Sequence, residues 1–135
     1  MRSMGFLGKK MNGEAPGRTT RSLGQAAEDL ALAHLGAAGL ALVERNYRTP
    51  GRGGGEIDLV MRERDGTLVF VEVRSRGGAG FGGAAASIGA TKRRRIILAA
   101  RHYLLRWPAP PPCRFDAVLI DGGQVQWLRA AFDAE

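Results

Sequence analysis

Residues 55–76 constrain the fold more than any other stretch, because they carry carboxylates inside two apolar runs. The runs flank Arg-Asp-Gly at residues 64–66, a turn signal, so the sequence predicts a β-hairpin. Glu56, Asp58 and Glu72 all lie within this hairpin. Burying a carboxylate costs several kcal/mol or more unless a cation or hydrogen bonds compensate it. We therefore expect a specific partner to hold these acids.

The length of the turn decides whether the acids meet. A two-residue loop at residues 65–66 would put Asp58 and Glu72 on opposite faces of the hairpin. A three-residue loop at residues 64–66 sets them directly across from each other, with Cβ atoms roughly 5 Å apart. The longer loop is favoured because its third residue is glycine, which accepts the left-handed backbone of a bulged hairpin. By the period of two, Glu56 then shares the face of Asp58, and Arg74 shares that of Glu72.

Length, composition and cysteine count limit the class of protein to which this chain can belong. A chain of 135 residues, 44% hydrophobic and 24% charged, is typical of one soluble globular domain. It has no apolar run long enough to span a membrane and no signal-peptide core, so a cytoplasmic location is expected. The single cysteine, Cys113, excludes an internal disulfide and is expected to be a packed free thiol. No Ser-His-Asp or Cys-His set can be assembled, and two histidines with one cysteine argue against structural zinc.

The net charge of +7 is unevenly distributed. Residues 1–21 carry five basic residues against one acid, whereas the remaining chain carries 15 bases and 12 acids. We expect residues 1–21 to form a disordered basic tail and residues 22–135 a single domain. Such a tail raises non-specific affinity for polyanions such as DNA or RNA.

The first helix is expected to follow a capping box at Ser22 and Gln25 and to extend to about Gly39. It is apolar almost all round, which is typical of a covered helix. Glu28 is in register with its apolar positions, so its side chain is expected to point into packed structure. A role at the positive end of the helix dipole is the alternative, and the residues alone do not decide between them.

A second helix is expected from about Ala84 to Trp107, and it carries a basic run. The run comprises Lys92, Arg93, Arg94 and Arg95, a candidate phosphate contact whose alternative is a solvated helix face. Lys92 falls at the border of the apolar stripe, where it could bend toward a site. Strands are expected at residues 40–47, 114–120 and 124–129, with Asp116 partly buried and paired with an arginine. The glycine-rich residues 49–55 lack the ending of a phosphate-binding loop and read as a connector.

Three motifs together resemble a known family. They are Ala-Glu at residues 27–28, Gly-Glu-Ile-Asp-Leu at 55–59 and Phe-Val-Glu-Val-Arg at 70–74. The chain is similar, over residues 22–130, to the small YraN-like bacterial proteins. These belong to the PD-(D/E)xK superfamily, with the restriction-endonuclease-like fold, and are related to archaeal Holliday junction resolvases. The resemblance implies an α/β fold in which helices flank a mixed central β-sheet, made of the antiparallel hairpin plus later strands.

The resemblance also implies a metal-dependent endonuclease. Glu28, Asp58 and Glu72 would bind Mg²⁺ or Mn²⁺, with Glu28 reaching in through water, and oxygen-only ligands suit such hard cations. The metal would activate a water for hydrolysis of a DNA phosphodiester, with branched or junction DNA as candidate substrates. Arg74 departs from the family pattern, in which lysine is common. Arginine still stabilises charge but cannot act as a general base, so Lys92 is a candidate to supply a lysine.

Two other functions remain open at this point. One is a nucleic-acid-binding accessory protein of the same fold with weak or absent catalysis. The other is a structural interaction module whose acids form arginine salt bridges. A homodimer is also open, because resolvase relatives cut junctions as dimers.

Overall fold

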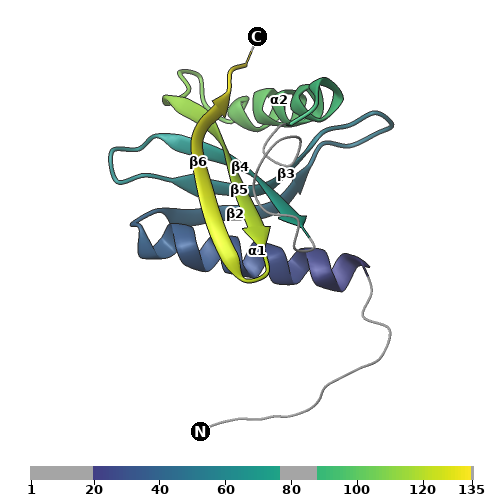
Figure 1. Ribbon diagram of the computed structural model, residues 1–135. Helices are drawn as coiled ribbons and strands as arrows, with labels where there is room; N and C mark the ends of the chain where they lie inside the picture. The colour runs from purple at the N-terminus through teal and green to yellow at the C-terminus, as the bar shows by residue number, and fades with distance from the viewer. Residues whose placement is uncertain (1–19, 77–87, 135) are drawn as a thin grey trace, which may run out of the picture.

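The computed structural model describes residues 20–76 and 88–134, in which two helices cover the two faces of a five-stranded sheet (Figure 1). The elements in chain order are α1 (Thr20–Ala37), β2 (Ala41–Arg48), β3 (Glu56–Arg62), β4 (Leu68–Arg76), α2 (Ala90–Leu104), β5 (Cys113–Asp121) and β6 (Gln124–Phe132). The strands are ordered β2-β3-β4-β5-β6, with β4 and β5 parallel and the other neighbours antiparallel. The predicted α/β class, with helices flanking a mixed sheet, is confirmed. No helix in the described ranges is both long and apolar enough to cross a membrane.

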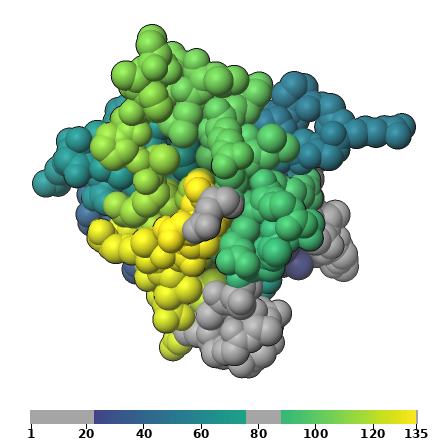
Figure 2. All heavy atoms as spheres, turned by 90° about the horizontal axis from the view of Figure 1, so that it is seen from above, coloured from purple at the N-terminus to yellow at the C-terminus, as the bar shows by residue number. Residues whose placement is uncertain are grey.

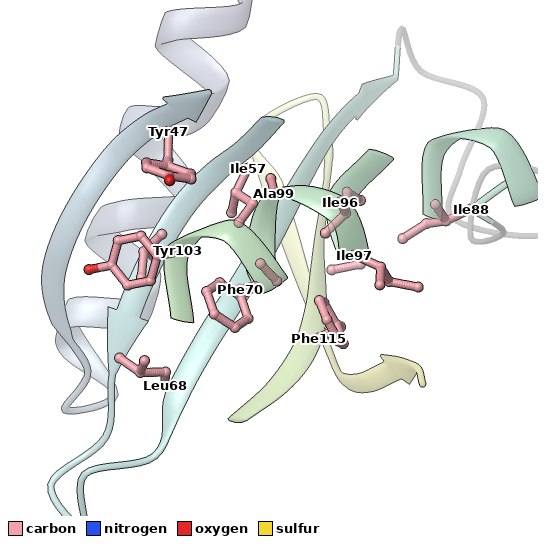
Figure 3. Packing of buried hydrophobic residues seen from close by; sticks show 13 residues of the cluster. Tyr47, Ile57, Leu68, Phe70, Ile88, Ile96, Ile97, Ala99, Tyr103 and Phe115 are labelled. Atoms are coloured by element: carbon pink, nitrogen blue, oxygen red, sulfur yellow. The ribbon is translucent and has the colours of Figure 1, made fainter. Parts of the chain in front are cut away.

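Each face of the sheet has its own apolar core, because each is covered by a helix. Under α2, aromatic and aliphatic side chains from four strands and the helix pack together, including Tyr47, Phe70, Tyr103 and Phe115 (Figure 3). Under α1, Ala31 and Leu35 pack against residues of β3, β4 and β5. A buried polar side chain in such a sheet therefore needs a specific reason.

The hairpin has the predicted register. Glu63 N–H donates to Thr67 O at 2.9 Å, which closes a three-residue loop, and Gly66 has a φ of 94°. Pairing of Leu59 with Val71 follows from this loop. Regular pairing ends at these two residues, and just beyond them the side chains of Asp58 and Glu72 interact with each other.

α2 packs unusually close to the start of β3 because residue 55 is glycine. A Cβ on Gly55 would lie 1.9 Å from the carbonyl oxygen of Arg95 and 2.9 Å from the nitrogen of Ala99. The same residue closes the preceding loop, since its N–H donates to Thr49 Oγ1 at 2.7 Å and its carbonyl accepts the N–H of Thr49 at 3.0 Å. The β2–β3 loop then projects beside α2 (blue and green in Figure 2). Gly55 thus fixes both the helix and the loop next to the acidic residues.

Several predicted boundaries differ from the structure. α1 spans Thr20–Ala37, so Ser22 lies inside the helix and is not its N-cap as predicted. α2 begins at Ala90; part of its predicted start, residues 84–87, and tail residues 1–19 lie outside the described residues. Cys113 is a free thiol, but it is exposed rather than packed, because it begins the strand where the chain leaves a proline-rich segment.

Asp116 pairs with an arginine, as predicted, but it is fully buried and not partly buried as expected. Both of its oxygens accept from Arg114 Nε, at 3.0 and 3.2 Å. It also accepts from Trp127 Nε1 and from the N–H of Ala130, each at 2.9 Å. This carboxylate is fully satisfied by β5 and β6, so its role is structural.

Candidate active site

Asp58 lies where regular pairing between β3 and β4 ends. The first pair is Arg62 with Leu68 next to the turn, and the last pair is Leu59 with Val71. Beyond them, Asp58 Oδ2 accepts the backbone N–H of Val73 at 2.8 Å, in place of a main-chain partner. The carboxylate therefore stands in a notch between the two strands.

Glu72 faces this notch from β4 and is almost completely buried, with 6% of its surface exposed. Its Oε1 has no hydrogen-bond donor among the described residues, and its Oε2 lies 3.7 Å from Lys92 Nζ. Burial, followed by the charge of Asp58, raises the pKa of Glu72 to about 8, although Lys92 and Arg74 oppose the rise. Two ionised carboxylates are acceptors only, so neither can satisfy the other without a shared proton or a cation.

The pKa values of the two other acids at the notch also shift upward. Burial raises the pKa of Asp58, against the opposing hydrogen bond from Val73. Burial and then the charge of Asp58 raise the pKa of Glu28, against hydrogen bonds from Arg45 and Asn46. Clustered acids with raised pKa values are common at functional sites. They mark a place where additional positive charge would be stabilised.

Glu28 reaches the notch from α1. It lines a hollow of about 380 Å³ together with Asp58 and Glu56, and its side chain is 14% exposed. The side chain is therefore largely covered, as predicted, but it faces a hollow and not packed side chains. Arg45 Nη2 lies 3.4 Å from Glu28 Oε1, and Arg45 Nη1 lies 2.9 Å from Asp29. The two neighbouring acids of α1 are thus held by one guanidinium.

A second hollow, of about 570 Å³, opens on the α2 side of Glu72. Arg74 and Lys92 both line it, as does Arg95. Lys92 bends toward the acids, as its border position predicted. The predicted basic run divides here. Lys92 and Arg95 line the hollow, whereas Arg93 and Arg94 do not, and Arg94 donates to Thr91 Oγ1 at 3.4 Å. The structure therefore brings together Glu28, Asp58, Glu72, Arg74 and Lys92, and separates Arg93 and Arg94 from them.

Sequence reasoning missed the surroundings of Glu56. Arg48, Lys92 and Arg95 all lie close to its carboxylate. The pairing of Arg48 with Glu56 across the β2–β3 loop was a signal that the sequence did contain. The approach of Lys92 and Arg95 depends on how α2 packs, which spacing along the chain does not reveal.

The fit to a divalent cation rests on the donors in the notch. In the described parts of the chain, no three His, Cys, Asp or Glu side chains gather as a set able to hold a metal ion. Asp58 and Glu72 do offer a pair of oxygen ligands, and the buried Oε1 of Glu72 lacks a partner. Oxygen donors of this kind suit Mg²⁺, which keeps several waters and is often held by one or two carboxylates. The donor set therefore fits a hydrated hard cation held by two carboxylates.

Residues 27–120 match the family model described as "Uncharacterised protein family UPF0102". A UPF0102 protein of Acidovorax sp. (strain JS42) is 79% identical over 131 residues, which cover 97% of this chain and 99% of that protein. The chain belongs to the UPF0102 family. A UPF0102 protein of Paracidovorax citrulli is 72% identical, and the match covers 97% of this chain and 99% of that protein. A UPF0102 protein of Verminephrobacter eiseniae is 65% identical, and the match covers the full length of both chains. The predicted YraN-like membership is confirmed, and the UPF0102 match spans every residue of the candidate site.

Proposed function

We propose that this UPF0102 protein is a divalent-cation-dependent endonuclease that hydrolyses phosphodiester bonds in DNA. One observation carries the proposal: Glu72 Oε1 is buried without a donor, beside a second carboxylate and within reach of a lysine. Because its pKa is about 8, buried Glu72 retains a proton and hydrogen-bonds to Asp58. A cation in the notch would take the place of that proton and stabilise both groups as carboxylates. The resemblance of residues 55–59 and 70–74 to motifs of the PD-(D/E)xK superfamily, together with the order of helices and strands, supports this proposal.

In this mechanism Asp58 and Glu72 would hold the cation, and Glu28 would contribute to its surroundings through water. When bound, Mg²⁺ or Mn²⁺ supplies charge neutralisation at the phosphate and a water of lowered pKa. Val73 N–H orients Asp58 by donating to its Oδ2, which leaves the other carboxylate oxygen as a candidate ligand. Arg45 holds Glu28 in place without occupying the notch itself.

In the family pattern one lysine, at the position of Arg74, both stabilises the phosphate charge and positions the attacking water. Here Arg74 and Lys92 would each take one of these roles. Arg74 presents a guanidinium that would stabilise the negative charge of the phosphate in the transition state. Lys92 reaches the same hollow from α2 and positions the attacking water or protonates the leaving oxygen. The site thereby keeps a lysine although the strand supplies arginine.

Two measurements test this function. Labelled duplex, flap and four-way-junction DNA are incubated with the protein and Mg²⁺, Mn²⁺ or EDTA, and calorimetry measures Mg²⁺ and Mn²⁺ binding. Cleavage and cation binding are both expected to disappear in Glu72→Gln and Asp58→Asn. Glu44→Gln is the matched control, because Glu44 pairs with Arg106 on the surface. Wild-type protein that neither binds the cations nor cuts any of the substrates would refute the proposal.

A catalytically weak nucleic-acid-binding protein is the second candidate, and Arg74 is the observation that favours it. This second function predicts that the protein binds DNA in EDTA and that no added cation supports cleavage. A purely structural role for the acids is less well supported. Among the described side chains, no ion pair joins Glu72 to an arginine, and its Oε1 has no donor.

A further inference from the structure

Glu56 stands at the centre of three basic side chains. Arg48 Nε lies 3.9 Å from Glu56 Oε1, Arg95 Nη2 lies 4.0 Å from the same oxygen, and Lys92 Nζ lies 4.0 Å from Oε2. All three separations exceed the length of a hydrogen bond. One carboxylate therefore gathers three cations without tying up their donors.

The backbone fixes this arrangement from two directions. β2 pairs with β3 so that Arg48 lies opposite Glu56. α2 is held against the start of β3 by the close approach at Gly55, and Arg95 Nε donates to the carbonyl of Gly54 at 3.2 Å. The cations thus come from separate elements that are locked at this point of the fold.

The group remains open to solvent and carries excess positive charge. The side chains of Arg48, Arg95 and Lys92 are 71%, 48% and 30% exposed, against 30% for Glu56. Three positive charges surround one negative charge, and the free guanidinium donors have the planar geometry that matches phosphate oxygens. A surface carboxylate needs only one such partner, so a structural ion pair does not account for three.

The group also lies at the boundary between the two hollows of the candidate site. Glu56 and Arg48 line the α1-side hollow with Asp58, whereas Lys92 and Arg95 line the α2-side hollow with Glu72. A nucleic-acid backbone with one phosphate in the notch would place a neighbouring phosphate against these cations.

We propose that Arg48, Lys92 and Arg95 form a phosphate-binding ring for the DNA backbone beside the notch, and that Glu56 is the positioning residue that holds the ring in shape. The inference rests on the proposed endonuclease function and adds a second phosphate contact to it. Glu56 lowers the intrinsic affinity of the ring for anions, because it competes with phosphate for the three cations. In exchange, the cations are already arranged when DNA arrives.

Binding without cleavage tests the ring. Fluorescence anisotropy measures the affinity of the full chain for labelled duplex DNA in EDTA, over a series of KCl concentrations. Each phosphate contact removed is expected to lower the slope of log K against log [salt] by about 0.9. Arg48→Gln and Arg95→Gln should each show this loss, and the double variant should show both losses. Arg101→Gln, an exposed position on the same helix, is the matched control and should leave the slope unchanged. Slopes that do not differ from the control would overturn the ring.

Glu56 is tested by separating binding from turnover. Glu56→Gln is expected to raise DNA affinity in EDTA several-fold and to lower the kcat of Mg²⁺-dependent cleavage, with Glu56→Asp restoring part of the turnover. If Glu56 has only a structural role, Glu56→Gln will lower the melting temperature but leave the DNA affinity and its salt dependence unchanged. That result would overturn the positioning role.

The two proposals fail in different ways. Suppose that wild-type protein binds DNA and that the ring variants show a smaller slope of log K against log [salt], but no cation supports cleavage. The endonuclease function then fails, and the phosphate-binding ring stands. If wild-type protein cleaves DNA while Arg48→Gln and Arg95→Gln bind as the control does, the ring fails alone. Wild-type protein that does not bind DNA at all overturns the ring.

Discussion

Lys92 Nζ lies 3.7 Å from Glu72 Oε2, so a residue of α2 meets the most buried acid of β4. The two residues are joined through the crossover between β4 and the parallel strand β5, which carries α2 over the sheet. This contact supplies the site with a lysine although residue 74 is arginine.

Removing the amine of Lys92 is therefore expected to reduce cleavage by roughly 100-fold or more, the usual contribution of a positioned proton-transfer group. Lys92→Ala and Arg74→Ala are compared under single-turnover conditions, with Arg94→Ala as a control on the exposed face of α2. If Lys92→Ala cleaves as wild type does while Arg74→Ala is inactive, Lys92 has no part in the chemistry.

Stability should depend on pH through Glu72. Its folded pKa of about 8 is above the ordinary value of 4.5, so folding favours the protonated acid. The associated stability is fully present below pH about 4.5 and is lost as pH rises through about 8. The raised pKa values of Asp58 and Glu28 act in the same direction. In EDTA, the melting temperature is expected to fall across this window.

Glu72→Gln provides the matched comparison for that pH dependence. The neutral amide cannot ionise, so its melting temperature should change less between the two ends of the window and should exceed that of wild type at the alkaline end. Mg²⁺ should restore the wild-type protein there and leave the variant unaffected. A wild-type melting temperature that rises with pH in EDTA contradicts the assignment of a raised pKa to Glu72.

Gly55→Ala is expected to destabilise the protein by about 1–3 kcal/mol or more, as overpacking does, because the new Cβ would meet the backbone of α2. Gly24→Ala is the control, since a Cβ there has nothing within 4 Å, and alanine should stabilise the exposed helix by up to about 1 kcal/mol. Chemical denaturation measures both free energies of unfolding. Equal effects at the two positions would show that the packing at Gly55 is not tight.

Asp116→Ala should destabilise by at least about 1–3 kcal/mol, because it leaves the N–H donors of Trp127 and Ala130 without their buried acceptor and removes one of the two acidic partners of Arg114. It should not alter cation affinity in the folded protein, since its contacts are all with β5 and β6. Denaturation and calorimetry at a temperature where the variant is folded separate these effects. Loss of cation binding by folded Asp116→Ala would link it to the notch after all.

The part of the site formed by the hairpin was predictable from sequence. A glycine at position 66 selects the loop, the loop selects the register, and the register brings Asp58 and Glu72 together. These steps involve neighbours in the chain and a period of two. The buried pairing of Asp116 with an arginine followed from similar reasoning.

The surroundings of Glu56 were not predictable in the same way. They depend on the docking of α2, which is fixed by a close backbone approach at Gly55 rather than by any side-chain pattern. The helix was predicted to start at the alanines of residues 84–86, because alanine has the highest helix propensity. α2 instead begins at Ala90, after Gly89, which is its N-cap and has an extended backbone. Cys113 was expected to be packed on general grounds, but its position at the first residue of β5 leaves it exposed.

Hydrogen bonds between Thr49 and Gly55 close the base of the β2–β3 loop, so the tip of the loop is separated from the strands that carry it. Residues inserted or deleted between these two anchors would change how far the tip extends without shifting Glu56 or Asp58. A designer could therefore graft a different recognition segment here and keep the underlying scaffold intact.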